Sequence, residues 1–169
     1  MSAGEFWGLL GVFVGGATPW LEAIVVIPAG IIAGLPPVLV ILAGASGNLL
    51  TVAVAAFAGE WLKEKWSAWR QRRREVTGKA ADPHAEAQRA ARAQKRRARI
   101  ERIMTRGGLP LLALVGPLGI GTQISVLVAV ATGVRARSAF LWIGGATLAW
   151  CIVAGVAAVH GIALLGITS

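Results

Sequence analysis

The chain has 169 residues, of which 56% are hydrophobic and 15% are charged, and its mean hydropathy is +0.67. This composition excludes an ordinary water-soluble domain and predicts an integral membrane protein. The formal net charge of +9 is local, because all but two of the 17 Lys and Arg residues lie between Lys63 and Arg106. Cys151 has no partner for a disulfide, and no nucleotide-binding loop, catalytic triad or cluster of metal ligands occurs. Neither an enzyme nor a cofactor is therefore expected.

The first apolar block runs from Phe6 to Gly59, and Glu22 is its only charged residue. The block is too long for two spans of about 20 residues and barely long enough for three. Residues 6–17 therefore have three open placements: a span, an interfacial segment, or part of the first hairpin. Pro28-Ala29-Gly30 interrupts the apolar run, and Gly-Leu-Pro-Pro at residues 34–37 ends it. We expect a re-entrant hairpin over about residues 18–35, broken at Pro28, and a spanning helix over about residues 37–60.

A basic segment follows at residues 61–106. Asp82-Pro83 is a typical helix start, with Asp as the N-cap and Pro at the first helical position. A basic amphipathic helix beside a membrane binds anionic lipid, at about 1 kcal/mol per cation near the surface. We expect anionic-lipid contact or a simple topology signal here; a protein partner is the alternative, and nucleic acid is not expected. The expected lipid contacts lie along one helix face: Arg89, Arg92, Arg96 and Arg99. Three tryptophans are typical of interfacial anchors: Trp61, Trp66 and Trp69.

The second apolar block begins with an uncharged run from Leu109 to Val134, flanked by Arg106 before it and by Arg135 and Arg137 after it. The positive-inside bias places both flanks in the cytoplasm, so the run must turn back within the membrane. Residues 116–123, GPLGIGTQ, supply Pro and Gly residues for that turn. We expect a second re-entrant hairpin over about residues 108–134, followed by a spanning helix over about residues 138–165.

The two apolar blocks share one order of elements, a broken hairpin and then a spanning helix. Aligning Pro28-x-Gly30 with Pro117-x-Gly119 gives two membrane repeats, residues 1–60 and 107–169, whose hairpins enter from opposite sides. Internal symmetry of Gly- and Pro-interrupted segments is typical of transporters with a site between the repeats. The expected fold class is an all-α integral membrane protein: an inverted repeat of re-entrant hairpin plus transmembrane helix, with a basic cytoplasmic helical insert. The alternative is four ordinary helices with glycine kinks.

Four short motifs carry a family resemblance: PWLEAIVVIPAGIIAG at residues 19–34, Gly47-Asn48, GPLGIGT at residues 116–122, and FLWIGGATLAW at residues 140–150. The sequence resembles the small multidrug export protein family, which is itself similar to the DedA or VTT membrane proteins. The resemblance implies an inverted-repeat fold with two re-entrant hairpins and a transport role, and the DedA relatives are associated with moving polyprenyl phosphate and other lipids. Members of the family often carry an Arg two residues after the hairpin acid, where this chain has Ile24. The DedA-type Arg near the second hairpin also has no counterpart in residues 116–123.

Glu22 is the residue most open to a functional interpretation. An ionised carboxylate costs several kcal/mol in hydrocarbon, so a lone intramembrane acid is by default a site that takes up a proton. In the functional interpretation, Glu22 alternates between a proton and a cationic substrate, which couples efflux to proton entry. In the structural interpretation, Glu22 lies at the outer water interface near Trp20 and caps the first hairpin.

Other residues at or near the expected breaks are candidates for lining a transport pathway. Unwound backbone and half-helix N-termini there could face a substrate, and packing between helices is the alternative role for each. These candidates are Pro28, Gly30, Asn48, Pro117, Gly119, Gly121, Thr122 and Gln123.

The leading functional hypothesis is a small proton-coupled exporter of cationic or amphipathic compounds. It would lie in the cell membrane, inner or plasma, with residues 61–106 in the cytoplasm. A homodimer is expected, because two hairpins and two or three spans make a thin wall for one pathway. The alternative transport hypothesis is a DedA-like lipid carrier or flippase for polyprenyl phosphate or phospholipid. A second alternative is a non-transporting membrane scaffold.

Overall fold

The computed structural model describes residues 2–19, 21–76, 83–103, 107–119 and 121–164, and the regular elements in these ranges are helical. Helices α3 and α7 are long and apolar enough to cross a membrane, judged by length and composition. The four remaining apolar helices have 11 to 15 residues. The helices are α1 (Ala3–Ala17), α2 (Glu22–Ile32), α3 (Pro37–Val76), α4 (Pro83–Ile103), α5 (Leu109–Gly119), α6 (Thr122–Thr132) and α7 (Ala136–Leu164).

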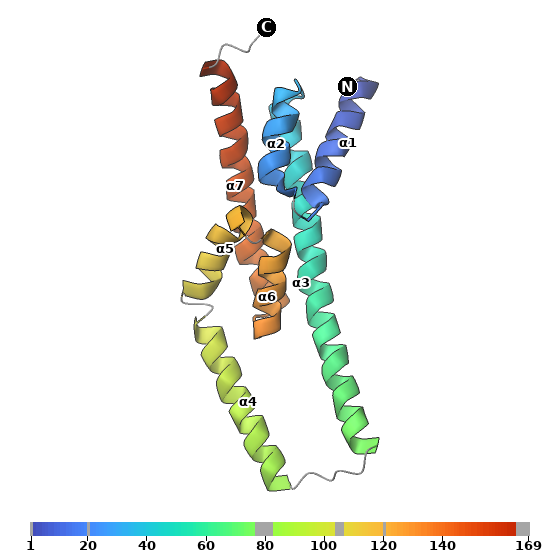
Figure 1. Cartoon of the computed structure of the whole chain (residues 1–169), viewed down its shortest axis with the longest axis vertical. Helices are drawn as coiled ribbons and strands as arrows, with labels where there is room; N and C mark the ends of the chain where they lie inside the picture. Colours follow the sequence, from blue (N-terminus) through green and yellow to red (C-terminus); the bar gives the residue numbers. More distant parts are fainter. Residues whose placement is uncertain (1, 20, 77–82, 104–106, 120, 165–169) are drawn as a thin grey trace.

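Two short helices followed by a long one occur twice in the chain, as α1, α2 and α3 and again as α5, α6 and α7 (Figure 1). In each set the first short helix runs toward the middle of the molecule and the second runs away from it. The two turns therefore meet at mid-height, and α2 and α6 start there and run in opposite directions. Both α2 and α6 pack against α3 and against α7.

The first hairpin reverses direction between Ala17, the last residue of α1, and Glu22, the first residue of α2. α1 begins with a capping box, in which the Ser2 hydroxyl accepts the Glu5 N–H and the Glu5 carboxylate accepts the Ser2 N–H. α1 ends just before Pro19, which cannot continue a helix. α1 packs against α2 and α3, so residues 6–17 form the first arm of a pair of short helices, and their placement in the membrane stays a prediction.

The expected break at Pro28 is wrong, since α2 continues from Glu22 to Ile32 with Pro28 inside it. A proline inside a helix leaves one carbonyl without its partner, and an apolar helix packed among its neighbours tolerates this. Gly30 serves close packing: a Cβ at this position would lie 2.9 Å from the Val12 side chain and 3.0 Å from that of Val40. Residues 18–35 thus hold one arm of the hairpin rather than the whole of it.

The boundary expected between residues 60 and 61 falls inside α3, which is continuous to Val76. The apolar part of α3 is therefore joined rigidly to the start of the basic segment. α4 begins at Pro83, while Asp82, its expected N-cap, lies outside the described residues. In the second half, α5 ends at Gly119, α6 begins at Thr122, and α7 begins at Ala136.

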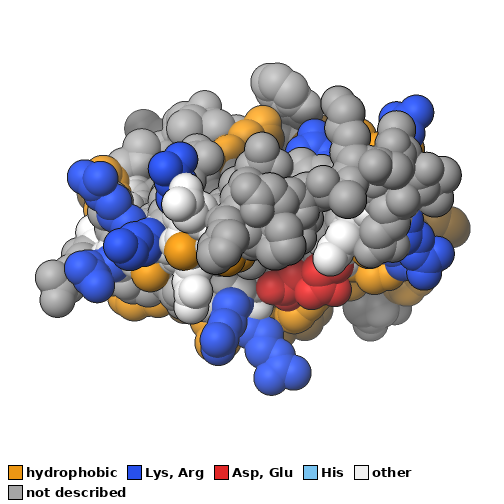
Figure 2. Space-filling model, turned by 90° about the horizontal axis from the view of Figure 1, so that it is seen from below, with side chains coloured by type: hydrophobic (Ala, Val, Ile, Leu, Met, Phe, Trp, Pro, Cys, Tyr) orange, Lys and Arg blue, Asp and Glu red, His pale blue; other side chains and the backbone are white. Residues whose placement is uncertain are grey.

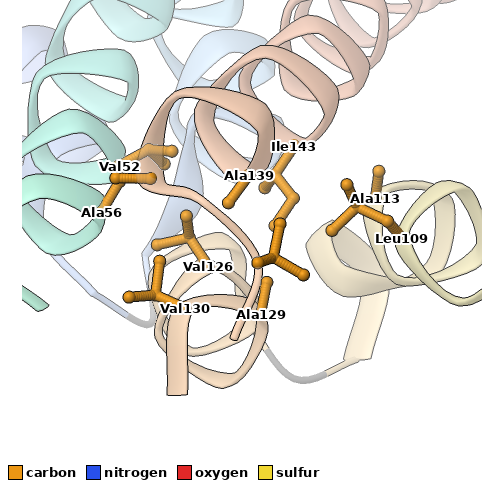
Figure 3. Packing of buried hydrophobic residues seen from close by; sticks show 11 residues of the cluster. Val52, Ala56, Leu109, Ala113, Val126, Ala129, Val130, Ala139 and Ile143 are labelled. Carbon is orange, nitrogen blue, oxygen red and sulfur yellow. The ribbon is translucent and has the colours of Figure 1, made fainter. Parts of the chain in front are cut away.

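Two apolar cores fill the molecule, one beside each hairpin. The first core is built from α1, α2 and the start of α3, and α7 contributes Cys151 to it. The second core is built from α3, α5, α6 and α7 (Figure 3). Its labelled side chains are Val52, Ala56, Leu109, Ala113, Val126, Ala129, Val130, Ala139 and Ile143. Because α3 and α7 contribute side chains to both cores, they fix the positions of the two hairpins relative to each other.

Candidate functional site

A layer of buried polar side chains separates the two apolar cores. On α3, Asn48 stands between Ala45 and Val52, which belong to different cores. On α7, Thr147 stands between Cys151 and Ile143 in the same way. Burying polar groups costs free energy unless they find partners, so a polar layer in an otherwise apolar interior needs an explanation. The layer consists of Glu22, Asn48, Thr122, Gln123, Ser125 and Thr147.

The polar layer lies at half the length of the apolar part of α3. Asn48 is midway between Pro37, where α3 begins, and Gly59, after which charged residues follow. At 1.5 Å per residue each end is about 16 Å away, and a bilayer's hydrocarbon core is about 30 Å thick. The polar layer thus lies at the midpoint of the apolar stretch of α3.

Glu22 is the first residue of α2 and is only 7% exposed. Its φ of 40° is the only positive φ among the described non-glycine residues. A residue held in this region costs about 1–3 kcal/mol and persists only where the surroundings fix it. Here the fixing contact is a hydrogen bond from the Thr122 N–H to Glu22 Oε1, with an N···O distance of 2.7 Å. The carboxylate therefore caps α6, on the opposite hairpin, where the helix dipole favours negative charge.

Gly121 makes this approach possible. As the N-cap of α6 it has φ 92° and ψ 141°, a conformation that residues with a Cβ rarely adopt. A Cβ at Gly121 would lie 3.3 Å from Glu22 Oε1. The glycine thus supplies both the backbone conformation of the second turn and the space for the carboxylate of the first.

Thr122 links three helices through its side chain. Its hydroxyl lies 3.0 Å from Asn48 Oδ1, 3.0 Å from Gln123 Oε1 and 3.5 Å from Glu22 Oε1. Gln123 Nε2 in turn donates to Thr51 Oγ1 at 3.1 Å. The tips of both hairpins are therefore connected to the middle of α3. Three buried side-chain atoms nevertheless have no hydrogen-bond partner among the described residues: Glu22 Oε2, Asn48 Nδ2 and Ser125 Oγ.

The other end of α6 is held by a cation. Lys63 Nζ, on α3, donates to the carbonyl oxygen of Val130 at 2.8 Å. α6 thus has a carboxylate at its N-terminus and an ammonium near its C-terminus, as its dipole favours at both ends. Beside Lys63 a hollow of about 280 Å³ is lined by Glu60, Lys63, Glu64, Ser67, Gly133 and Val134. Figure 2, which looks at this end, shows an acidic patch among Lys and Arg side chains.

Beyond its apolar part, α3 carries tryptophans paired with cations. The Lys65 ammonium lies 5.5 Å from the centre of the Trp61 ring, and the guanidinium of Arg73 lies 5.0 Å from that of Trp69. Trp66 and Arg70 form a third pair at 5.7 Å. Of the four arginines predicted to contact lipid from α4, Arg92 and Arg99 have exposed side chains, and the side chains of Arg89 and Arg96 lie outside the described set.

The predicted pathway residues separate into two groups. Asn48, Thr122 and Gln123 meet around the predicted coupling residue Glu22, with Gly121 beside them. The others lie within helices: Pro28 and Gly30 in α2, and Pro117 and Gly119 in the last turn of α5. The cap expected of Glu22 in the structural interpretation also exists, but on α6 and not on the first hairpin.

Three contributors were not singled out from the sequence. Ser125 and Thr147 are two of several small polar residues in apolar runs, and Lys63 is one of many cations. The sequence could have identified Lys63 by its position, because it is the first cation after the apolar part of α3.

These features define a small helical membrane protein whose two short-helix hairpins meet at a buried carboxylate. The chain belongs to the family described as "Putative small multi-drug export protein", which matches residues 22–153, more than half of the chain. Comparisons with curated proteins and with solved structures gave no significant match. The family resemblance drawn from the sequence motifs is confirmed, and the relationship to DedA or VTT proteins stays a prediction.

Proposed function

We propose that the protein exports cationic or amphipathic compounds and that Glu22 couples this export to proton entry. The observation that carries the proposal is the position of Glu22, the only charged residue between Phe6 and Gly59, buried where the two hairpins meet. One carboxylate oxygen is hydrogen-bonded to the N-terminus of α6, and the other has no partner among the residues that the structure describes. A buried carboxylate is stable when it carries a proton or when it faces a cation. Proton and substrate thus compete for one site.

The sign of the charge favours a cationic substrate over an anionic one. No Lys or Arg occurs in residues 1–62 or in residues 107–134, so the hairpins have no cation with which to bind a phosphate. A polyprenyl phosphate or phospholipid headgroup brought to the polar layer would instead face Glu22 and be repelled. The lipid-carrier alternative and the scaffold alternative therefore have less support than the exporter.

The same arrangement supports an inverted repeat with re-entrant hairpins. With 11 to 15 residues, the short helices are about 16 to 22 Å long, too short to cross a hydrocarbon core of about 30 Å. Two hairpins entering from opposite faces and meeting at Glu22 would leave one barrier on each side of the site. Alternate opening of the hairpins would then expose Glu22 to one side at a time.

We further propose a cell-membrane location with the basic segment in the cytoplasm and in contact with anionic lipid. The Trp–cation pairs of α3 and the exposed arginines of α4 are suited to a phosphate-rich surface. We also propose a homodimer, since two hairpins and two long helices make a thin wall for one pathway.

A flux assay in proteoliposomes tests the exporter. Dansylcadaverine and its trimethylammonium derivative serve as amphipathic cations, and a lipid phosphate serves as the anionic comparison. With the cations loaded inside and an inward proton gradient, export of at least one of them is expected to be accompanied by proton entry into the vesicle, and only when the wild-type protein is present. Vesicles with Glu22→Gln protein control for passive leakage of the amine. Proton entry driven by the lipid phosphate alone would favour the carrier instead.

A further inference from the structure

With the side-chain oxygen and nitrogen atoms of the polar layer assigned as they are, its hydrogen bonds cannot all form at the same time. The Thr122 hydroxyl has a single hydrogen, yet Asn48 Oδ1 and Gln123 Oε1 both lie 3.0 Å from it, and both are acceptors. At the same time Asn48 Nδ2, a donor, has no partner. Exchanging the oxygen and nitrogen of the Asn48 amide removes both conflicts, because nitrogen then donates to Thr122 Oγ1 and the hydroxyl donates to Gln123.

After this exchange the Thr122 hydroxyl has one donor and one acceptor, and two buried oxygens that can only accept, together with the Ser125 hydroxyl, have no partner among the described residues. They are Glu22 Oε2, Asn48 Oδ1 and Ser125 Oγ. All three side chains are more than nine-tenths buried, and Ser125 follows Thr122 by one turn of α6. Two buried acceptors without donors, one of them the Glu22 carboxylate, and a hydroxyl that can also accept are suited to a cation that brings hydrogen-bond donors with it.

We propose that the polar layer binds a primary ammonium group, and that the exported cations are amines that keep their N–H bonds. This inference rests on the proposed export function and names its substrate class. A primary ammonium has three N–H donors, one for each unpartnered oxygen. A quaternary ammonium has none and is recognised through aromatic faces, and the described residues of the polar layer include no aromatic side chain.

Ser125 provides the sharpest test, because its hydroxyl oxygen makes no hydrogen bond within the described structure. Ser125→Ala removes no hydrogen bond recorded here, so the variant should melt at the wild-type temperature or above it. Ser46→Ala is the matched control, since Ser46 is exposed on α3 and its hydroxyl bonds the Ala43 carbonyl. Binding of dansylcadaverine and of its trimethylammonium derivative is measured by fluorescence titration of each purified full-length variant in detergent.

We expect wild-type protein to bind the primary amine at least about tenfold more tightly than the trimethyl derivative, since a charge-assisted hydrogen bond contributes about that factor. Ser125→Ala should reduce this preference about tenfold, Ser46→Ala should keep it, and Glu22→Gln should abolish binding of the primary amine.

Equal binding of both cations, with proton-coupled flux intact, would overturn the ammonium site but leave the export function standing. Binding of neither cation would overturn the ammonium site as well, and absence of flux with either would then count against export. A wild-type preference unchanged in Ser125→Ala would also contradict the assignment. Stabilisation of the protein by Na⁺ that requires Glu22 and that dansylcadaverine does not reverse would also contradict the assignment.

Discussion

Gly121→Ala tests whether the two hairpins meet as described, because the substitution acts on the second turn and on the carboxylate of the first. Holding alanine at φ 92° and ψ 141° costs about 1–3 kcal/mol. The new Cβ would lie 3.3 Å from Glu22 Oε1, so the carboxylate must move and weaken its 2.7 Å bond to the Thr122 N–H. Losing part of a charge-assisted bond worth about 1.5–3 kcal/mol adds to the strain. We expect a total loss of about 2–4 kcal/mol in the free energy of unfolding.

The assay is unfolding of the purified protein in mixed micelles, followed by far-UV circular dichroism. Gly133→Ala is the matched control, since Gly133 also has a positive φ, 114°, but a Cβ there would meet nothing within 4 Å. That control should lose only the backbone strain, about 1–2 kcal/mol. In a Glu22→Ala background the carboxylate is gone, so Gly121→Ala should cost about 1–2 kcal/mol less than in the wild type. Equal costs of Gly121→Ala in the two backgrounds would refute the contact between the hairpin tips.

Three further predictions follow from other contacts. Lys63→Met removes the ammonium that bonds the Val130 carbonyl, and should lower the free energy of unfolding by about 1 kcal/mol in the same micelle assay; Lys65→Met, whose ammonium faces the Trp61 ring, should cost less. Asn48→Leu removes a buried partner of Thr122 and should cost about 1–3 kcal/mol and lower proton-coupled flux, whereas a loss of flux without a loss of stability would assign Asn48 to substrate contact alone. Single cysteines at positions 80, 107 and 136 in a Cys151→Ala background should react with a membrane-impermeant maleimide only from the cytoplasmic side, and labelling of position 136 from outside would remove the second re-entrant hairpin.

The helical class, the two long helices and the second turn could be predicted from the sequence because each depends on local pattern. Apolar runs of spanning length identify α3 and α7, and a cluster of Gly and Pro marks the reversal between the end of α5 and the start of α6. The turn of the first hairpin was misplaced because two Pro signals compete there. Pro19 ends α1 and Pro28 is absorbed within α2, and a proline alone does not say which occurs.

The candidate site was predicted only in part. Glu22 stands out in any apolar sequence, but its partner, the Thr122 N–H, belongs to a residue 100 positions away. That pairing depends on how the hairpins pack, which no local pattern records. Asn48 and Thr122 were identified through neighbouring glycines, and Gly121 does have a structural role at the contact. Lys63 acts on α6 through tertiary contact alone, so the sequence shows it only as one cation in a basic segment.

The most direct test of the central claim is proton-coupled flux of dansylcadaverine in proteoliposomes containing Glu22→Gln protein. Glutamine keeps an oxygen that accepts the Thr122 N–H but cannot ionise, so the protein should stay folded, with a melting temperature lowered by no more than the weakening of this one hydrogen bond. We predict that substrate-dependent proton flux is lost in Glu22→Gln and retained, with a shifted pH optimum, in Glu22→Asp. A Glu22→Gln protein that still moves protons with substrate at the wild-type rate would contradict coupling through Glu22.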